Sequence, residues 1–195
     1  MPNVHAVHSV GHSLVTWLKN SYPAEIREIA DCEFSLLSSG EMASKEERGP
    51  ALTLWLYRVG WNEHLRHAGR RGDGPGARTP MFLELHFLLT AWADNALAEH
   101  TLITWAMRQL HDHPMLDLST LSPEGGWTAG DQVQVVPAEL STEELMRIWD
   151  TLEPAYRLSV VYVARVVRVD PDGPAPEALP VAASRFVFSG PGGAS

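Results

Sequence analysis

Three apolar segments with strand-like patterning constrain the fold of this chain more than any other feature of its sequence. Residues 51–59, 81–91 and 157–169 each alternate with a period of two, which is typical of β-strands. In residues 51–59 both alternating sides are apolar or aromatic, so we expect cover on both faces of the sheet. All three segments are shorter than the roughly 20 residues of a membrane-spanning helix. We therefore predict a buried sheet and no membrane insertion.

Helical signals separate these strands. Apolar residues with helical spacing predict a helix over residues 4–19, and Asp94 or Asn95 can cap a second helix that runs to about His111. Ser141 and Glu144 form a capping box at the start of a third helix. Shorter strands are predicted at residues 33–37 and 131–136, and loops at residues 38–50 and 60–80. The order of elements predicts an α+β fold, a mixed α/β sandwich in which one central mixed or antiparallel sheet packs against about three helices.

The chain is predicted to contain one domain and a tail. The length of 195 residues fits a single domain over residues 1–170. Residues 171–195 are rich in proline and glycine, with one possible short strand at residues 185–188.

Composition excludes several classes of function. The formal net charge is −9, which argues against nucleic-acid binding because phosphate contacts need clustered cations. The single cysteine, Cys32, allows no internal disulfide, and its acidic neighbours Asp31 and Glu33 predict an unreactive thiol. No signal peptide is visible at the start of the chain, so we predict a cytoplasmic origin.

Histidines provide the first candidates for catalytic chemistry. His8 and His12 are four residues apart and share one face of the first predicted helix, with His5 nearby. His111 and His113 flank an aspartate at the end of the second helix. Zinc normally takes three or four protein ligands, and no nucleophile motif accompanies either group. We predict no catalytic residue, no metal and no cofactor, and keep a small histidine-dependent metal hydrolase as a less favoured alternative.

A basic segment is the strongest candidate for a binding surface. Residues 58–78 contain five arginines and two acidic residues, in contrast to the acidic chain as a whole. This charge fits contact with an acidic partner surface, and a solvated loop is the alternative. Trp61 and Trp127 lie in predicted loops, where each can either anchor an interface or pack over the edge of the core. The candidate interface residues are Arg58, Trp61, Arg66, Arg70, Arg71, Arg78 and Trp127.

Three segments in fixed order carry a family resemblance. They are LTLWLYRVGWNEHLR (52–66), LELHFLLTAWADNALAEHTLITWAMRQLHDHPML (83–116) and ELSTEELMRIWDTLEPAYRLSVVYVARVVRVD (139–170). Together they resemble the small terminator, or cap, proteins of phage-tail-like contractile injection systems, of the N-terminal-domain type. Any one segment alone would be a weak signal, whereas the combination spans most of the chain.

The resemblance implies a structural role and a phage tail-terminator-like fold. Proteins of this family form a sixfold ring on the end of the inner tube farthest from the baseplate, stop tube growth and hold the last sheath layer. The implied partners are therefore other copies of the chain in a homohexamer, the inner tube protein and the sheath protein. The family brings no catalytic residues. Another ring or adaptor component of the same machine, at the neck or baseplate, is the alternative.

Sheath arms in such machines add as strands to sheet edges. The expected edge strand in this chain is residues 132–136 or residues 185–188.

Overall fold

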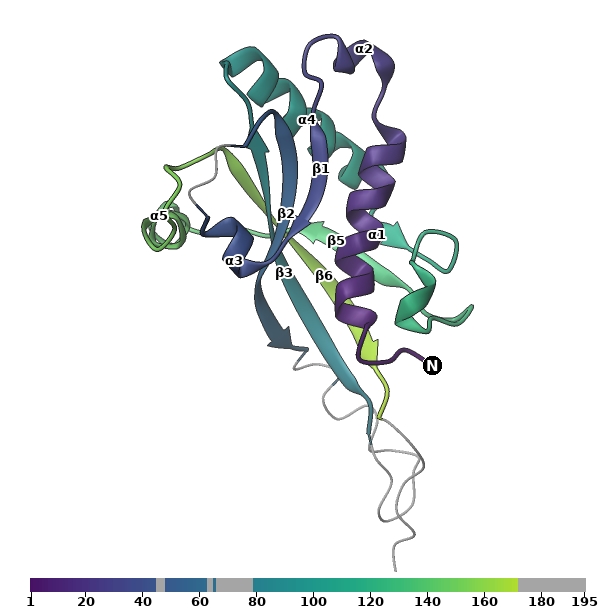
Figure 1. Ribbon diagram of the computed structural model, residues 1–195. Helices are drawn as coiled ribbons and strands as arrows, with labels where there is room; N and C mark the ends of the chain where they lie inside the picture. Colours follow the sequence, from purple (N-terminus) through teal and green to yellow (C-terminus); the bar gives the residue numbers. More distant parts are fainter. Residues whose placement is uncertain (45–47, 63–64, 66–78, 172–195) are drawn as a thin grey trace, which may run out of the picture.

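The computed structural model describes residues 1–44, 48–62, 65 and 79–171 (Figure 1). Its elements in chain order are α1 (Ala6–Ser21), α2 (Ala24–Arg27), β1 (Glu33–Leu37), α3 (Ser39–Met42), β2 (Ala51–Trp61), β3 (Met81–Trp92), α4 (Ala96–Asp112), β4 (Met115–Leu116), the 3-10 helix η2 (Pro123–Gly125), β5 (Val133–Pro137), α5 (Thr142–Asp150) and β6 (Ser159–Val169).

The described strands form one mixed sheet of six strands in the order β1-β2-β3-β6-β5-β4. β1 runs parallel to β2, and every other neighbouring pair is antiparallel. The long strands β2, β3 and β6 occupy consecutive places in this order, and each buries side chains on both of its faces. The predicted α+β class, with a mixed central sheet, is confirmed.

Two cores lie on opposite faces of the sheet. On one face α1 and α4 pack against Leu52 and Leu54 of β2 and against Phe87 of β3, all nearly inaccessible to solvent. On the other face Trp149 of α5 packs against Trp92 of β3, with ring centroids 6.2 Å apart. The expected cover on both sides of β2 is therefore confirmed. Figure 1 shows β3 and β6 continuing past the N-terminal end of α1.

Local signals fix where the helices begin. Asn95, one of the two cap residues that the sequence left open, caps α4 by accepting a hydrogen bond from the Ala98 N–H. Ser141 and Glu144 form the expected capping box at α5. α1 ends at Ser21, before Pro23. Among the described residues, no helix is long and apolar enough to span a membrane.

Three expectations about loops and edges are corrected. The predicted loop at residues 38–50 contains the short helix α3, because Ser38 and Glu41 form a second capping box. β2 extends to Trp61, two residues into the predicted loop at 60–80. β5 is not an edge strand, because it lies between β6 and β4. The predicted strand at residues 185–188 lies outside the described residues.

Candidate functional site

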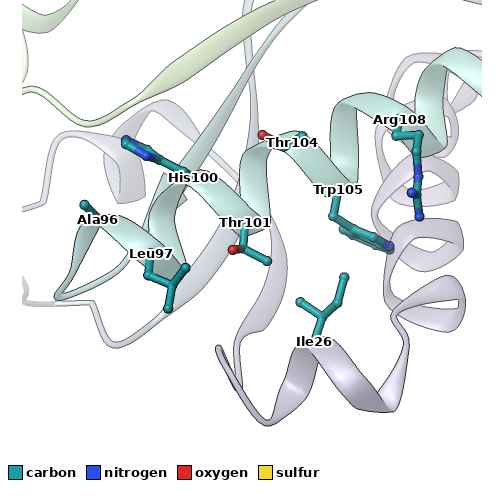
Figure 2. Close-up of a pocket in the computed structure, with 8 residues that line it drawn as sticks. All are labelled: Ile26, Ala96, Leu97, His100, Thr101, Thr104, Trp105 and Arg108. Carbon is teal, nitrogen blue, oxygen red and sulfur yellow. The ribbon is translucent and has the colours of Figure 1, made fainter.

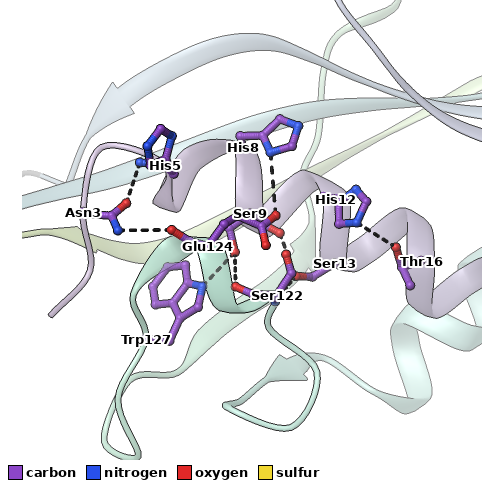
Figure 3. Close-up of polar contacts among 10 residues, drawn as sticks. All are labelled: Asn3, His5, His8, Ser9, His12, Ser13, Thr16, Ser122, Glu124 and Trp127. Atoms are coloured by element: carbon purple, nitrogen blue, oxygen red, sulfur yellow. Dashed lines mark hydrogen bonds and ion pairs between the residues drawn. The ribbon is translucent and has the colours of Figure 1, made fainter.

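The N-terminal histidines lie on the outer side of α1. The His8 and His12 rings stack with centroids 5.8 Å apart, and the His8 Nδ1 lies 3.8 Å from the Glu124 Oε1 (Figure 3). His5, His8 and His12 are all exposed. Among the residues that the structure describes, no group of three or more His, Cys, Asp or Glu side chains is placed to hold a metal ion. The stacked His8 and His12 rings therefore give no support to a histidine-dependent hydrolase.

Beneath these histidines a buried polar network docks α1 onto the η2 segment. The Ser9 hydroxyl donates to the Ser122 carbonyl at 2.8 Å and accepts a hydrogen bond from the Trp127 Nε1 at 2.8 Å (Figure 3). The Ser13 hydroxyl accepts from the Ser122 N–H at 2.8 Å. A side chain at Gly125 would meet the Trp127 indole, since its Cβ would lie 2.3 Å from the Nε1. The Ser9, Ser13 and Trp127 side chains find their partners within this network, whereas the buried Ser122 hydroxyl has no hydrogen-bond partner among the described residues. The contacts join α1 to the η2 segment, so we assign the network a structural role.

Trp127 is therefore not an exposed interface anchor, which was one of its two predicted roles. It is only 8% exposed and packs over the edge of the main core, which is the second of the two readings open from the sequence. Trp61, by contrast, is 62% exposed at the end of β2 and presents its indole to solvent.

A shallow pocket of about 500 Å³ lies between α2 and α4 (Figure 2). Among the eight described residues that line it, His100 and Arg108 are the only ionisable ones. The lining thus contains no carboxylate or thiol that could pair with His100 as a nucleophile or orient it as a base. This pocket is not arranged for catalysis. Its lining residues are Ile26, Ala96, Leu97, His100, Thr101, Thr104, Trp105 and Arg108.

The single cysteine is also chemically quiet. Burial is the main reason that the pKa of the Cys32 thiol rises to about 11, and Asp31 raises it further. The nearby hydroxyl of Tyr22, which donates to the Ala30 carbonyl at 2.6 Å, acts on the thiol in the opposite direction and offsets part of the rise in its pKa. At neutral pH the thiol is almost entirely protonated, which fits the predicted lack of reactivity.

The basic segment is only partly described. Arg66, Arg70, Arg71 and Arg78 lie outside the described residues. Arg58 is exposed and lies opposite His86 of β3 in the strand register. Arg165 of β6 lies on the same side of the sheet, two residues beyond Val163, the other cross-strand partner of His86. The sequence predicted His86 as a packed or interface histidine within a strand, but it did not connect His86 or Arg165 with Arg58, because only the strand order brings the three together.

Burial is the main reason that the pKa of His86 lies below its usual value, and the positive charges of Arg58 and Arg165 lower it further. The neighbouring Glu84 acts in the opposite direction. His86 is therefore held in its neutral form between two cations. This arrangement offers positive charge to a ligand and no proton donor at neutral pH.

Sequence comparison identifies the family. The model of the Pvc16 N-terminal domain matches residues 9–183. The chain belongs to the Pvc16 N-terminal domain family. No curated protein matches the sequence.

The fold of this Pvc16 N-terminal domain protein is also found in a solved structure. The sheath/tube terminator of the extracellular contractile injection system PVC, in its extended state, is similar at 21% identity and a TM-score of 0.57. That similarity covers 96% of this chain and 65% of the terminator. The tube terminating cap of the anti-feeding prophage is 20% identical with a TM-score of 0.47, covering 71% of this chain and 50% of the cap. The chain thus spans about two thirds of the first structure and half of the second.

Proposed function

We propose that this protein is a structural cap, or terminator, of a contractile injection system, and that it is not an enzyme. It forms a ring on the distal end of the inner tube, ends tube growth and anchors the last sheath layer. The observation that carries the proposal is the fold shared with the PVC sheath/tube terminator over 96% of this chain. Membership of the Pvc16 N-terminal domain family supports the same role.

The proposed partners are other copies of the chain, the inner tube protein and the sheath protein. A closed ring of identical chains requires two different, mutually complementary surfaces on each copy. Six copies match the sixfold ring expected from the resemblance to phage tail terminators. The chain is made in the cytoplasm and is incorporated into the injection particle.

The sheath contact is proposed to use β1. Strand addition needs an unpaired strand edge, and β5 lacks one near its start because β4 and the Pro114 carbonyl pair with it. β1 is at the end of the described sheet and has five residues. Glu33 donates its N–H to the Pro50 carbonyl beside β2, so alternation turns the backbone groups of Phe34 and Leu36 toward the free edge.

Electron microscopy of particles from the native host, with and without this chain, tests the role. Without the chain we expect overlong, ragged or unsheathed tubes, and re-expression should restore a uniform length and a closed distal end. Particles of normal length with a normal distal end would contradict the cap function and favour an adaptor at the neck or baseplate. Elemental analysis of the untagged protein is the control for a metal enzyme, and we expect no stoichiometric metal.

A further inference from the structure

The face of the sheet that carries the smaller core, with Trp92 and Trp149, is covered by described helices at one end only. On this face α3 and α5 pack over the part of β3 that contains Leu88 and Trp92. The next β3 side chain on this side is His86, which is half-buried. Arg165 of β6 pairs with Gln134 of β5, and both are exposed. Polar and charged side chains therefore follow the aromatic core along the same face.

A β-bulge adds a second arginine to this part of the face. The register between β2 and β3 shifts between Leu56 and Arg58, so that Arg58 lies opposite His86. Without the bulge, alternation from the buried side of Leu56 would turn Arg58 toward the main core. Among the described residues, neither Arg58 nor Arg165 forms an ion pair. Glu84 lies on the same side of β3, two residues from His86, and its carboxylate offsets part of the positive charge. We call Arg58, His86 and Arg165, which together remain net positive beside Glu84, the basic face.

A surface of opposite charge lies on α5. This helix has three carboxylates and one arginine, and Glu143, Arg147 and Asp150 are exposed. A step of seven residues places Glu143 and Asp150 on one side of the helix, about 10 Å apart. Arg58 lies level with Val163, two strands away, and Arg165 lies two residues further along β6, so the two arginine Cα atoms are roughly 12 Å apart. The spacing of the carboxylates is thus similar to the spacing of the arginines.

Glu143 and Asp150 lie on the side of α5 that points away from the sheet of their own chain. Trp149 is buried against the sheet and Leu145 packs beside it, so the opposite side of the helix points outward.

Glu144, the third carboxylate, accepts hydrogen bonds from the Ser141 hydroxyl and N–H and is used by the cap. Glu144 lies nearer the sheet: these hydrogen bonds from Ser141 are the main reason that its pKa is lowered, and the charges of Arg147 and Arg58 lower it further. Glu143 pairs with Arg147 at 2.7 Å, but an ion pair this exposed is weak and leaves the carboxylate accessible.

We propose that the basic face of each copy binds the acidic side of α5, carrying Glu143 and Asp150, on the next copy around the ring. The inference rests on the proposed ring and names its contact. The two surfaces belong to different parts of one chain, as a head-to-tail contact requires. Like charges disfavour the face-to-face pairing that would give an isolated twofold dimer.

Charge reversal within the full-length chain tests the contact. Two double variants each place like charges across the contact: Arg58→Glu/Arg165→Glu and Glu143→Arg/Asp150→Arg. Each should raise the protein concentration needed for ring assembly by about 100-fold. The chain carrying all four substitutions should assemble again, as should an equimolar mixture of the two double variants. Assembly is measured by mass photometry, and by electron microscopy on tube ends; far-UV circular dichroism checks folding.

The controls separate this inference from the proposed function. Arg108→Glu reverses an exposed arginine on α4 and should leave assembly unchanged. If the wild-type chain forms a ring but Arg58→Glu/Arg165→Glu assembles equally well, the contact is refuted while the cap function stands. Intact rings that no longer attach to tube or sheath would assign the basic face to those partners and overturn the contact between copies. If the wild type forms no ring even on tube ends, both the cap function and this contact fail.

Discussion

Substituting Ser9 by alanine tests whether the buried polar network holds α1 against the η2 segment. Ser9 is 0% exposed, and its hydroxyl is both a donor to the Ser122 carbonyl and an acceptor for the Trp127 indole N–H. Alanine removes both hydrogen bonds while changing the packed volume very little. The indole N–H then remains buried beside a methyl group with no acceptor from α1.

The expected loss is about 2–3 kcal/mol in the free energy of unfolding. A typical intramolecular hydrogen bond contributes about 1 kcal/mol net, and a buried donor left unsatisfied costs about 1–3 kcal/mol. Both bonds are 2.8 Å long, so neither is weakened by poor distance. Water cannot easily replace the hydroxyl, because Trp127 is only 8% exposed.

Urea denaturation followed by far-UV circular dichroism measures this loss, since seven tryptophans would mix their signals in fluorescence. Trp127→Phe is the matched partner variant, because it keeps an aromatic ring and removes the N–H. Adding Ser9→Ala to Trp127→Phe should cost at least 1 kcal/mol less than adding it to the wild type. Thr104→Ala, at an exposed position on α4, should change stability by less than about 0.5 kcal/mol.

Two results would refute this reasoning. A change below about 0.5 kcal/mol for Ser9→Ala would mean that the hydroxyl contributes nothing net to docking. Strict additivity of Ser9→Ala and Trp127→Phe would mean that the two groups do not interact energetically.

Further predictions concern the α5 cap, the thiol and the basic face. Ser141→Ala should lower the free energy of unfolding by about 1 kcal/mol, because the Glu144 N–H loses its acceptor, and thermal unfolding measures it. Cys32, with a pKa of about 11, should react with iodoacetamide at pH 8 roughly 100-fold more slowly than a free thiol, with a rate that still rises above pH 9; fast labelling at pH 8 would disprove the burial argument. Arg58→Gln should raise the pKa of His86, because one nearby positive charge is removed; NMR titration measures the shift, and a fall would contradict the assigned proximity.

Most elements were predictable because their signals are local. β1 has the predicted bounds of Glu33–Leu37, and the Asn95 and Ser141 caps lie where the sequence places them. The error at residues 38–50 has a local cause as well. Ser38 and Glu41 form the same capping box as Ser141 and Glu144, but the charged composition of that segment favoured a loop.

The candidate surfaces were less predictable because they depend on pairing between distant strands. The sequence indicated Arg58 as a surface residue by the charge of its segment and Trp61 by its place in a predicted loop, and both are exposed. It gave no indication that Arg165 would lie beside His86, or that β4 would cover the edge of β5. Those positions depend on strand order and register, and the side that Arg58 faces depends on the β2 bulge; no short segment encodes either.

The sequence by itself determined the five longer strands, the Asn95 and Ser141 caps and the family, because alternation, capping and motif order are properties of short segments or of their succession along the chain. Tertiary structure alone decided that Trp127 is buried in the main core with its N–H bonded to Ser9, and that Arg58 faces away from that core. The physical reason is that burial and facing depend on which distant segments pack together, and a one-residue shift in register reverses the side of every later residue on the strand.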